Sequence, residues 1–246
     1  MSQKVFIIGA TSAIAESYAQ LCAAQQAELC LLGRNQDKLK AIADDLTIRG
    51  AHKVSVITAD INTLVSHAEH IQTALSELGG LDVVLIAHGT LPDQAQCQQD
   101  VTQCLSEINT NGVSTVSLLS QVSEVMASQN SGSLVVISSV AGDRGRQSNY
   151  VYGSAKAMVS AFAEGLISRF DGSGVHVALI KPGFVDTPMT QAFDKGALWA
   201  QSEDIARAIK TAIEKKRSIV YAPFFWWGIM QIIKNIPTFV FKKLSL

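Results

Sequence analysis

The chain has 246 residues, of which 48% are apolar and only 17% are charged. This length suits one large α/β domain, and the apolar share excludes collagen-like, disordered and low-complexity proteins. The charged share falls below the roughly 25% of ordinary soluble domains, so part of the surface is expected to be apolar.

The net charge of −1 hides an uneven distribution. From Lys210 onward the chain has seven basic residues against one acid, Glu214, so this end carries +6 and the rest carries −7. A basic, apolar terminus favours contact with a membrane surface. No nucleic-acid partner is expected, because no basic stripe with interleaved aromatic residues occurs elsewhere.

Neither a metal site nor a disulfide framework is expected. The four cysteines show neither CxxC nor zinc-site spacing, and His67 and His70 lie on a polar helix without a third ligand. Met1 leads directly into a strand-like run, without a signal-peptide pattern. We therefore expect a cytoplasmic protein with reduced thiols, in peripheral contact with the inner face of the membrane.

Short apolar runs alternate with helix-length segments along the chain. The runs predicted to be strands cover 5–8, 28–32, 54–57, 83–87, 134–137, 175–180 and 219–221. They are continuous rather than alternating, which is typical of a parallel sheet covered by helices on both faces. In the segment from Arg34 to Arg49, Asn35 is expected to cap a helix that Gly50 ends. The predicted fold class is α/β, a doubly wound parallel sheet (Rossmann fold) over 1–221, followed by an amphipathic helical tail over 222–246.

The first strand leads into a tight turn of small residues and then a helix, in the sequence IIGATSAIAESYAQ. Such a turn directs backbone N–H groups at a pyrophosphate, and the helix dipole favours the same anion. Turns of the GxxxGxG type carry glycine where this chain has Ala13 and Ala15, and the Ala13 methyl lies where backbone would approach a phosphate. The dinucleotide contacts predicted here are Gly9, Thr11, Ser12, Ala13 and Ile14.

The second strand ends in Gly33 and Arg34, without the carboxylate that would bind the ribose 2′-OH of NAD. A guanidinium at this place makes charge-assisted hydrogen bonds to a 2′-phosphate, so NADP(H) is the predicted cofactor, with Ser12 as a second contact. The alternative is that Arg34 only begins a solvated helix. Asp60, after the third strand, either accepts from the adenine amino group or caps the next helix.

The most specific pattern is YGSAK, in which Lys156 follows Tyr152 by four residues, with Ser139 thirteen residues before the tyrosine. The i, i+4 spacing places both side chains on one helix face. A cation at about 4 Å would stabilise the phenolate by roughly 4 kcal/mol before desolvation is subtracted, which lowers the pKa of the tyrosine. Ser139 would polarise a substrate carbonyl. Tyr150 is a weaker candidate, because Ser154 stands where a cation is needed.

On these residues the chain resembles the short-chain dehydrogenase/reductase family from position 3 to about 221. The resemblance maps the catalytic residues of the family onto Ser139, Tyr152 and Lys156. It also maps the helix asparagine, which holds a proton-relay water beside the lysine, onto Asn109 in EINTNGVSTV, with Asn111 as a competing candidate. The implied reaction is hydride transfer between NADP(H) and a carbonyl or alcohol, with the tyrosine giving the proton during reduction.

The resemblance implies further cofactor contacts from two loops. The NNAG element of the family appears as IAHG, and its PG element appears in KPGFVDTPM. Lys156 is expected to bind the nicotinamide ribose, and His88 either touches the cofactor or is packed in the interior. The segment from Met189 to Trp199 is expected to close over the substrate. The implied cofactor contacts are Tyr152, Lys156, Ala87, His88, Gly89, Pro182, Gly183, Val185 and Thr187.

The tail, FFWWGIMQIIKNIPTFVFKKL, combines a wide apolar face with a narrow polar stripe. A transmembrane span needs about 20 apolar residues, and Lys234, Asn235 and Pro237 interrupt this segment. We predict an interfacial helix, kinked at the proline, with Trp226 and Trp227 at headgroup depth. The alternative is that this face packs on the body of the protein or on a second subunit.

Within the family, the turn GATSAIAE, the segment LTIRGA and the tail FFWWGIM resemble the polyprenyl-phospho-pentose 2-keto reductases. This resemblance implies reduction of a keto sugar on a polyprenyl phosphate, with a flavin-dependent oxidase as partner. The alternatives are a reductase of a soluble carbonyl whose tail is an oligomer contact, and a non-catalytic NADP-binding protein. A homo-oligomer is also expected.

Overall fold

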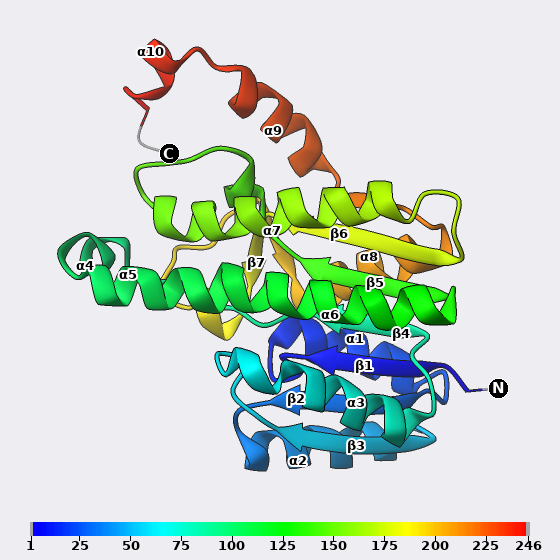
Figure 1. The fold of residues 1–246 in the computed structure, drawn as a ribbon. Helices are drawn as coiled ribbons and strands as arrows, with labels where there is room; N and C mark the ends of the chain where they lie inside the picture. Colours follow the sequence, from blue (N-terminus) through cyan, green and yellow to red (C-terminus); the bar gives the residue numbers. More distant parts are fainter. Residues whose placement is uncertain (1, 245–246) are drawn as a thin grey trace.

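The computed structural model describes residues 2–244 (Figure 1). Over this range the main sheet has seven parallel strands in the order β3-β2-β1-β4-β5-β6-β9. The strands are Lys4–Ile8 (β1), Glu28–Gly33 (β2), Lys53–Thr58 (β3), Val83–Ile86 (β4), Gly132–Ile137 (β5), Val175–Pro182 (β6) and Ile219–Ala222 (β9). The seven predicted strands and the doubly wound parallel sheet are confirmed.

Helices cover both faces of the sheet, as Figure 1 shows. One face packs on α1 (Ala13–Ala23), α2 (Gln36–Ile48) and α8 (Ser202–Glu214), and the other on α3 (His67–Leu78), α6 (Ser114–Gln129) and α7 (Tyr150–Arg169). Successive β1 residues alternate between the two layers: Val5 and Ile7 belong to the first core cluster, Phe6 and Ile8 to the second. Full burial of one such side chain contributes about 1.5–3 kcal/mol.

The remaining elements lie between the layers' strands and helices or follow the last strand. They are η1 (Leu64–Ser66), α4 (Gln94–Gln99), α5 (Val101–Ile108), the π-helical η2 (Asn109–Val113), η3 (Val140–Asp143), η4 (Pro188–Thr190), α9 (Phe225–Asn235) and α10 (Thr238–Phe241), with a small sheet of β7 (Phe184–Asp186) and β8 (Trp199–Gln201). Helix α2 forms as predicted: the Asn35 side chain accepts from the N–H of Lys38 at 2.9 Å, and Gly50 follows the helix with φ of +103°. Its apolar stripe is buried on the sheet because Leu39, Ile42 and Leu46 share one face.

The tail forms two short helices rather than one kinked helix. Helix α9 ends at Asn235, Ile236 is extended, and α10 begins after Pro237, because the residue before a proline disfavours helical geometry. Figure 1 shows both helices at the top of the view, above α7. Among residues 2–244 no helix combines the length and the apolar character needed to cross a bilayer.

The placement predicted for Trp226 at headgroup depth is wrong. Trp226 and Met230 are buried against Val140 and Tyr221, and the Trp226 ring packs edge-on against Phe184, with centroids 5.1 Å apart. This inner face of α9 therefore packs on the body of the protein, which was one of the alternatives to membrane contact. The outer face remains exposed, with Trp227 at 49%.

Candidate active site

The predicted site residues lie at the carboxyl ends of neighbouring strands. The turn 9–14 follows β1, Arg34 follows β2, Asp60 follows β3, 87–89 follow β4, Ser139 follows β5, and Gly183 follows β6. The order of the sheet reverses between β1 and β4, since β2 lies on one side and β5 on the other. Ligands of open parallel sheets bind at such a reversal, outside the carboxyl ends of the strands.

Ser139 and Tyr152 meet because the loop after β5 lies directly on α7. A β-carbon on Gly142 would lie 2.7 Å from the carbonyl carbon of Lys156, so only glycine permits this approach. Tyr152 and Lys156 share one face of α7, and the Ser139 side chain hydrogen-bonds to the phenol. The Lys156 ammonium is buried, donates to the carbonyl oxygen of Ile137 at 3.2 Å, and lies 5.7 Å from the centroid of the tyrosine ring.

The electrostatics of this cluster differ from the expectation. Burial raises the pKa of Tyr152 to about 12, although the Ser139 hydrogen bond lowers it, and burial lowers the pKa of Lys156 to about 8. The expected depression of the tyrosine pKa by the lysine is therefore wrong, because desolvation of the phenolate is the larger effect. At neutral pH the phenol keeps its proton and can act as a general acid.

The two candidate asparagines lie in the π-helical turn η2, and they face different ways. Asn109 donates from Nδ2 to Asn62 Oδ1 at 3.1 Å. Asn111 is fully buried, and its Oδ1 accepts from the N–H of Thr90 at 2.9 Å. A β-carbon on Gly89 would lie 2.9 Å from that oxygen and 3.6 Å from Lys156 Nζ. The Asn111 amide oxygen and Lys156 Nζ thus both lie close to Gly89, whereas the Asn109 amide contacts Asn62.

The turn after β1 has the features that a dinucleotide requires. Gly9 has φ of +82°, and a β-carbon there would lie 2.5 Å from the backbone N of His88, so glycine is needed. Ser12 is the N-cap of α1 but makes no side-chain cap hydrogen bond. The first N–H groups of α1 therefore have no intrahelical partner and suit an anion. Ala15 is fully buried, which fits a packing role, and Ala13 is partly exposed at the helix start.

Arg34 is exposed and has no hydrogen bond or ion pair within residues 2–244. Four residues later, Lys38 donates from Nζ to the carbonyl oxygen of Thr11 at 3.1 Å. Sequence reasoning missed this second cation, although its place in the first turn of the helix after Arg34 was an available signal. Asp60 accepts from the N–H of Asn62 at 3.0 Å, and the next helix begins only at Leu64. Asp60 is therefore not the helix cap, and contact with the adenine amino group is the alternative that remains.

Two of the histidines, His88 and His67, make hydrogen bonds inside the protein. Burial lowers the pKa of His88 to about 3, and its Nε2 lies 3.0 Å from both Ser114 Oγ and Thr115 Oγ1. His67, expected on a polar helix surface, is fully buried, with Nε2 2.8 Å from the carbonyl oxygen of Ile61. No group of three or more His, Cys, Asp or Glu residues in the described part of the chain could hold a metal ion.

A buried ion pair holds the loop that carries Ser139. Lys181 Nζ lies 2.8 Å from Asp143 Oδ1, and Tyr221 donates to Asp143 Oδ2 at 2.6 Å. This network ties η3 to β6 and β9, directly before the Pro182–Gly183 step. Sequence reasoning missed it; the available signal was a lysine in a strand that is otherwise apolar.

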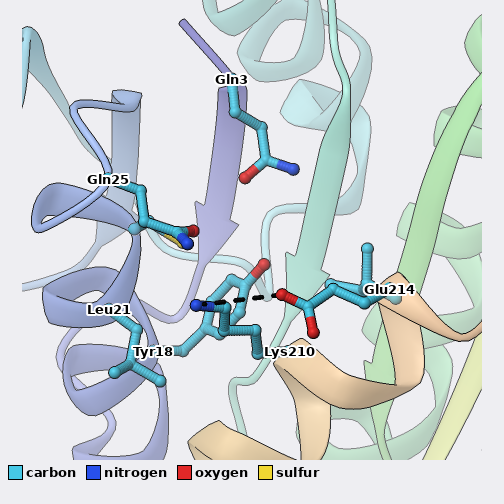
Figure 2. A pocket seen from close by; sticks show the side chains of 8 residues that line it. Gln3, Tyr18, Leu21, Gln25, Lys210 and Glu214 are labelled. Atoms are coloured by element: carbon cyan, nitrogen blue, oxygen red, sulfur yellow. Dashed lines mark ion pairs between the residues drawn. The ribbon is translucent and has the colours of Figure 1, made fainter.

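The small hollow in Figure 2 lies on the opposite edge of the sheet. It has a volume of about 50 Å³ between α1 and α8, with Tyr18, Lys210 and Glu214 in its lining. Gln3, just before β1, marks this as the amino edge. The hollow is a gap in helix packing and shares no residue with the candidate active site.

Comparison with known proteins identifies the family. The family described as short chain dehydrogenase matches residues 3–197. This chain belongs to the short-chain dehydrogenase family. An uncharacterized oxidoreductase of Mycobacterium tuberculosis is 34% identical over 240 residues, which cover 98% of this chain and 96% of the relative. An uncharacterized oxidoreductase of Streptomyces coelicolor is 30% identical over 243 residues, covering 98% and 96%.

Solved structures share the fold of this short-chain dehydrogenase. A short-chain type dehydrogenase/reductase from Mycobacterium ulcerans has a TM-score of 0.78 at 22% identity, covering 90% of this chain and 89% of its own. An actinorhodin polyketide ketoreductase solved with NADPH has a TM-score of 0.80 at 18% identity, covering 90% and 97%. The chain is thus an enzyme, an oxidoreductase of the short-chain dehydrogenase type.

Proposed function

We propose that this enzyme is an NADPH-dependent reductase of a keto group on a polyprenyl-phosphate-linked sugar. The observation that carries the reductase assignment is the cluster of Ser139, Tyr152 and Lys156, in which the tyrosine and the lysine share one face of α7 beside the loop of the serine. A reductase needs a proton donor at the place where a carbonyl oxygen becomes an alkoxide. The lipid-linked sugar is favoured by the exposed aromatic tail and by the resemblance of the turn, 46–51 and tail segments to polyprenyl-phospho-pentose 2-keto reductases.

Each residue of the cluster has a role in the proposed reaction. NADPH would supply the hydride. The Tyr152 hydroxyl donates its proton to the developing alkoxide, and the Ser139 hydroxyl donates a hydrogen bond to the same oxygen. Lys156 binds the nicotinamide ribose, and its ammonium stabilises the phenolate left after proton transfer. A relay water beside the lysine returns the proton, held by η2 through Asn109 or Asn111.

Preference for NADPH rests on the cations beside the first turn. Arg34 is free to bind a 2′-phosphate, and Lys38 lies next to the same turn through its bond to Thr11. The remaining contacts proposed for the dinucleotide lie along the carboxyl edge of the sheet: Gly9, Ser12, Ala13, Ile14, Asp60, Ala87, Gly89, Pro182, Val185 and Thr187. The solved actinorhodin ketoreductase, whose fold is shared, was crystallised with NADPH.

The outer face of the tail is the proposed membrane contact. Phe224 is 76% exposed, Ile232 70% and Phe239 68%, and Lys234, Lys242 and Lys243 supply positive charge among them. Exposed aromatic and aliphatic side chains with interspersed lysines bind the interface of anionic membranes. We place the reaction at the cytoplasmic face, with a flavin-dependent oxidase supplying the keto sugar. A second subunit on this same face is the competing candidate, since its exposure fits an oligomer contact equally.

The test of the reductase is NADPH consumption by the full-length enzyme with a keto sugar on a prenyl phosphate. Tyr152→Phe should reduce turnover at least about 1000-fold, because it removes the proton donor. Tyr150→Phe is the matched control, since Tyr150 lies two residues away on the same helix and is 42% exposed. Unchanged turnover in Tyr152→Phe would refute the mechanism.

Membrane contact is tested separately by flotation with anionic vesicles. Replacement of Phe224 and Phe239 by serine should release the protein from the vesicles without loss of NADPH binding. Retained vesicle binding contradicts the membrane role, and a change from oligomer to monomer in the same variant indicates a subunit contact instead.

A further inference from the structure

Arg146 is a buried arginine in the loop that joins Ser139 to Tyr152. The residue is only 9% exposed, and its Nε has no hydrogen-bond partner. One terminal nitrogen lies 3.5 Å from Met230 Sδ in α9, and a thioether is a weak acceptor. Within residues 2–244 this guanidinium makes no ion pair.

The neighbouring charges do not neutralise Arg146. Asp143, three residues earlier, already accepts from Lys181 and Tyr221 through its two oxygens. Arg144 donates to the carbonyl oxygen of Lys234 at 3.1 Å and lies 3.8 Å from the centroid of the Phe241 ring. An unpaired buried cation is costly, and burial lowers the pKa of this arginine. The charge of Asp143 partly stabilises the guanidinium, but no carboxylate of the described chain lies close enough to form an ion pair with it.

The contacts of this cation connect it to the loop that carries Ser139. Met230, its contact in α9, packs in one cluster with Val140, which follows the catalytic serine, and with Trp226. A β-carbon on Gly183 would lie 1.9 Å from Trp226 Nε1, so the indole covers the loop proposed to face the nicotinamide. Other buried polar atoms without a partner gather on this loop and the adjoining helices: Gln94 Nε2, Asn149 Oδ1 and Trp226 Nε1. Gln94 belongs to this region because its Oε1 accepts from the N–H of Val151 at 3.0 Å.

We propose that Arg146 binds a phosphate group of the ketone substrate through charge-assisted hydrogen bonds. A guanidinium has a planar set of donors that matches two oxygens of a phosphate, and Nε is one of these donors. The inference rests on the proposed reductase function. It adds the residue that would bind the phosphate group of the ketone substrate. The phosphate is either a soluble ester or the phosphodiester of a lipid-linked sugar, since both present the same oxygens.

The test compares three ketones with the full-length enzyme at saturating NADPH: a neutral keto sugar, its phosphate monoester, and its prenyl phosphodiester in micelles. Arg146→Met removes the charge and leaves an apolar side chain of similar length. Arg207→Met is the matched control, because the Arg207 side chain is 62% exposed on α8. In Arg146→Met, kcat/KM for the phosphorylated ketones should fall about 10- to 100-fold through KM, the loss expected for hydrogen bonds to a charged group. The neutral ketone should change less than about twofold.

The thermal unfolding midpoint separates binding from structure. Replacing an unpaired buried cation by an apolar side chain should leave the midpoint of Arg146→Met unchanged or higher. A response of the prenyl phosphodiester alone assigns the subsite to lipid-linked substrates, and a response of the monoester alone assigns it to soluble ones. An equal loss for the neutral ketone, or no loss for either phosphorylated ketone, overturns the proposal.

Failure of the reductase assignment itself gives a different result. If the wild-type enzyme reduces none of the three ketones, phosphate binding is measured as the shift of the unfolding midpoint by inorganic phosphate. The enzyme is first saturated with NADP, so that Arg34 is occupied. A shift that is kept in Arg207→Met and lost in Arg146→Met supports the subsite without the reaction. No shift in the wild type overturns it.

Discussion

The buried pair of Lys181 and Asp143 predicts a large cost for a small substitution. Both side chains are nearly inaccessible, at 7% and 4%. Asp143→Asn preserves shape and can still accept from Tyr221, but it leaves the lysine with Glu164 alone, at 3.5 Å and 48% exposed. Breaking a buried pair from one side costs about 3–5 kcal/mol. Because Glu164 remains, we expect about 3 kcal/mol, which lowers the unfolding midpoint by roughly 6–12 °C in a chain of this size.

Urea unfolding of three variants tests this reasoning. Glu77→Gln is the control for an exposed pair, since Lys53 and Glu77 are 2.8 Å apart but 43% and 44% exposed, and it should cost less than about 1 kcal/mol. The double variant Asp143→Leu with Lys181→Met should recover part of the stability, because it removes both charges of the pair, although the Tyr221 hydroxyl loses its acceptor. Equal costs for Asp143→Asn and Glu77→Gln, or a double variant no more stable than the single, would refute the account.

Three further outcomes follow from the site. As pH rises through about 8, kcat/KM for reduction should fall because Lys156 loses its proton; a level pH profile to about pH 10 contradicts this role. The unfolded chain holds the same proton more tightly, so this lysine should make the free energy of unfolding rise between about pH 8 and about 10.4, as urea titrations at several pH values would detect. Arg34→Gln should raise the KM for NADPH about 10- to 100-fold and leave the KM for NADH unchanged. An equal rise in both KM values would indicate a disturbed turn instead.

The sheet could be predicted because its strands are continuous apolar runs. In β6 all eight residues are buried, and a run of this kind has one stable place, between two helical layers. The edge strand β3 is the informative exception: it alternates in exposure, and Val56 is 41% exposed. Its short apolar run, 54–57, still predicts a strand.

The site could be predicted only where function depends on local spacing. Tyr152 and Lys156 lie one helical turn apart, so their shared face follows from the sequence. The electrostatic outcome could not be read in the same way, because it depends on how deeply distant segments bury the two groups. The choice between Asn109 and Asn111 depends on a π turn, which carries no sequence signal of its own. The burial of Arg146 could not be predicted either, because it depends on a contact with Met230, which lies in the tail, far along the chain.

The tail has one face that packs on the body and one that is exposed, and this arrangement decides how the role of the tail can be tested. Its inner face, through Trp226 and Met230, covers Gly183 and contacts the buried arginine, whereas Phe224 and Trp227 stack on its outer face with centroids 6.1 Å apart. Removal of the whole tail would uncover Gly183 and the buried arginine at the same time as it removed the proposed lipid contact. Loss of activity in a truncated chain would therefore say nothing about membranes. Only substitutions confined to the outer face separate the two roles, since they leave the core cluster of α9 in place.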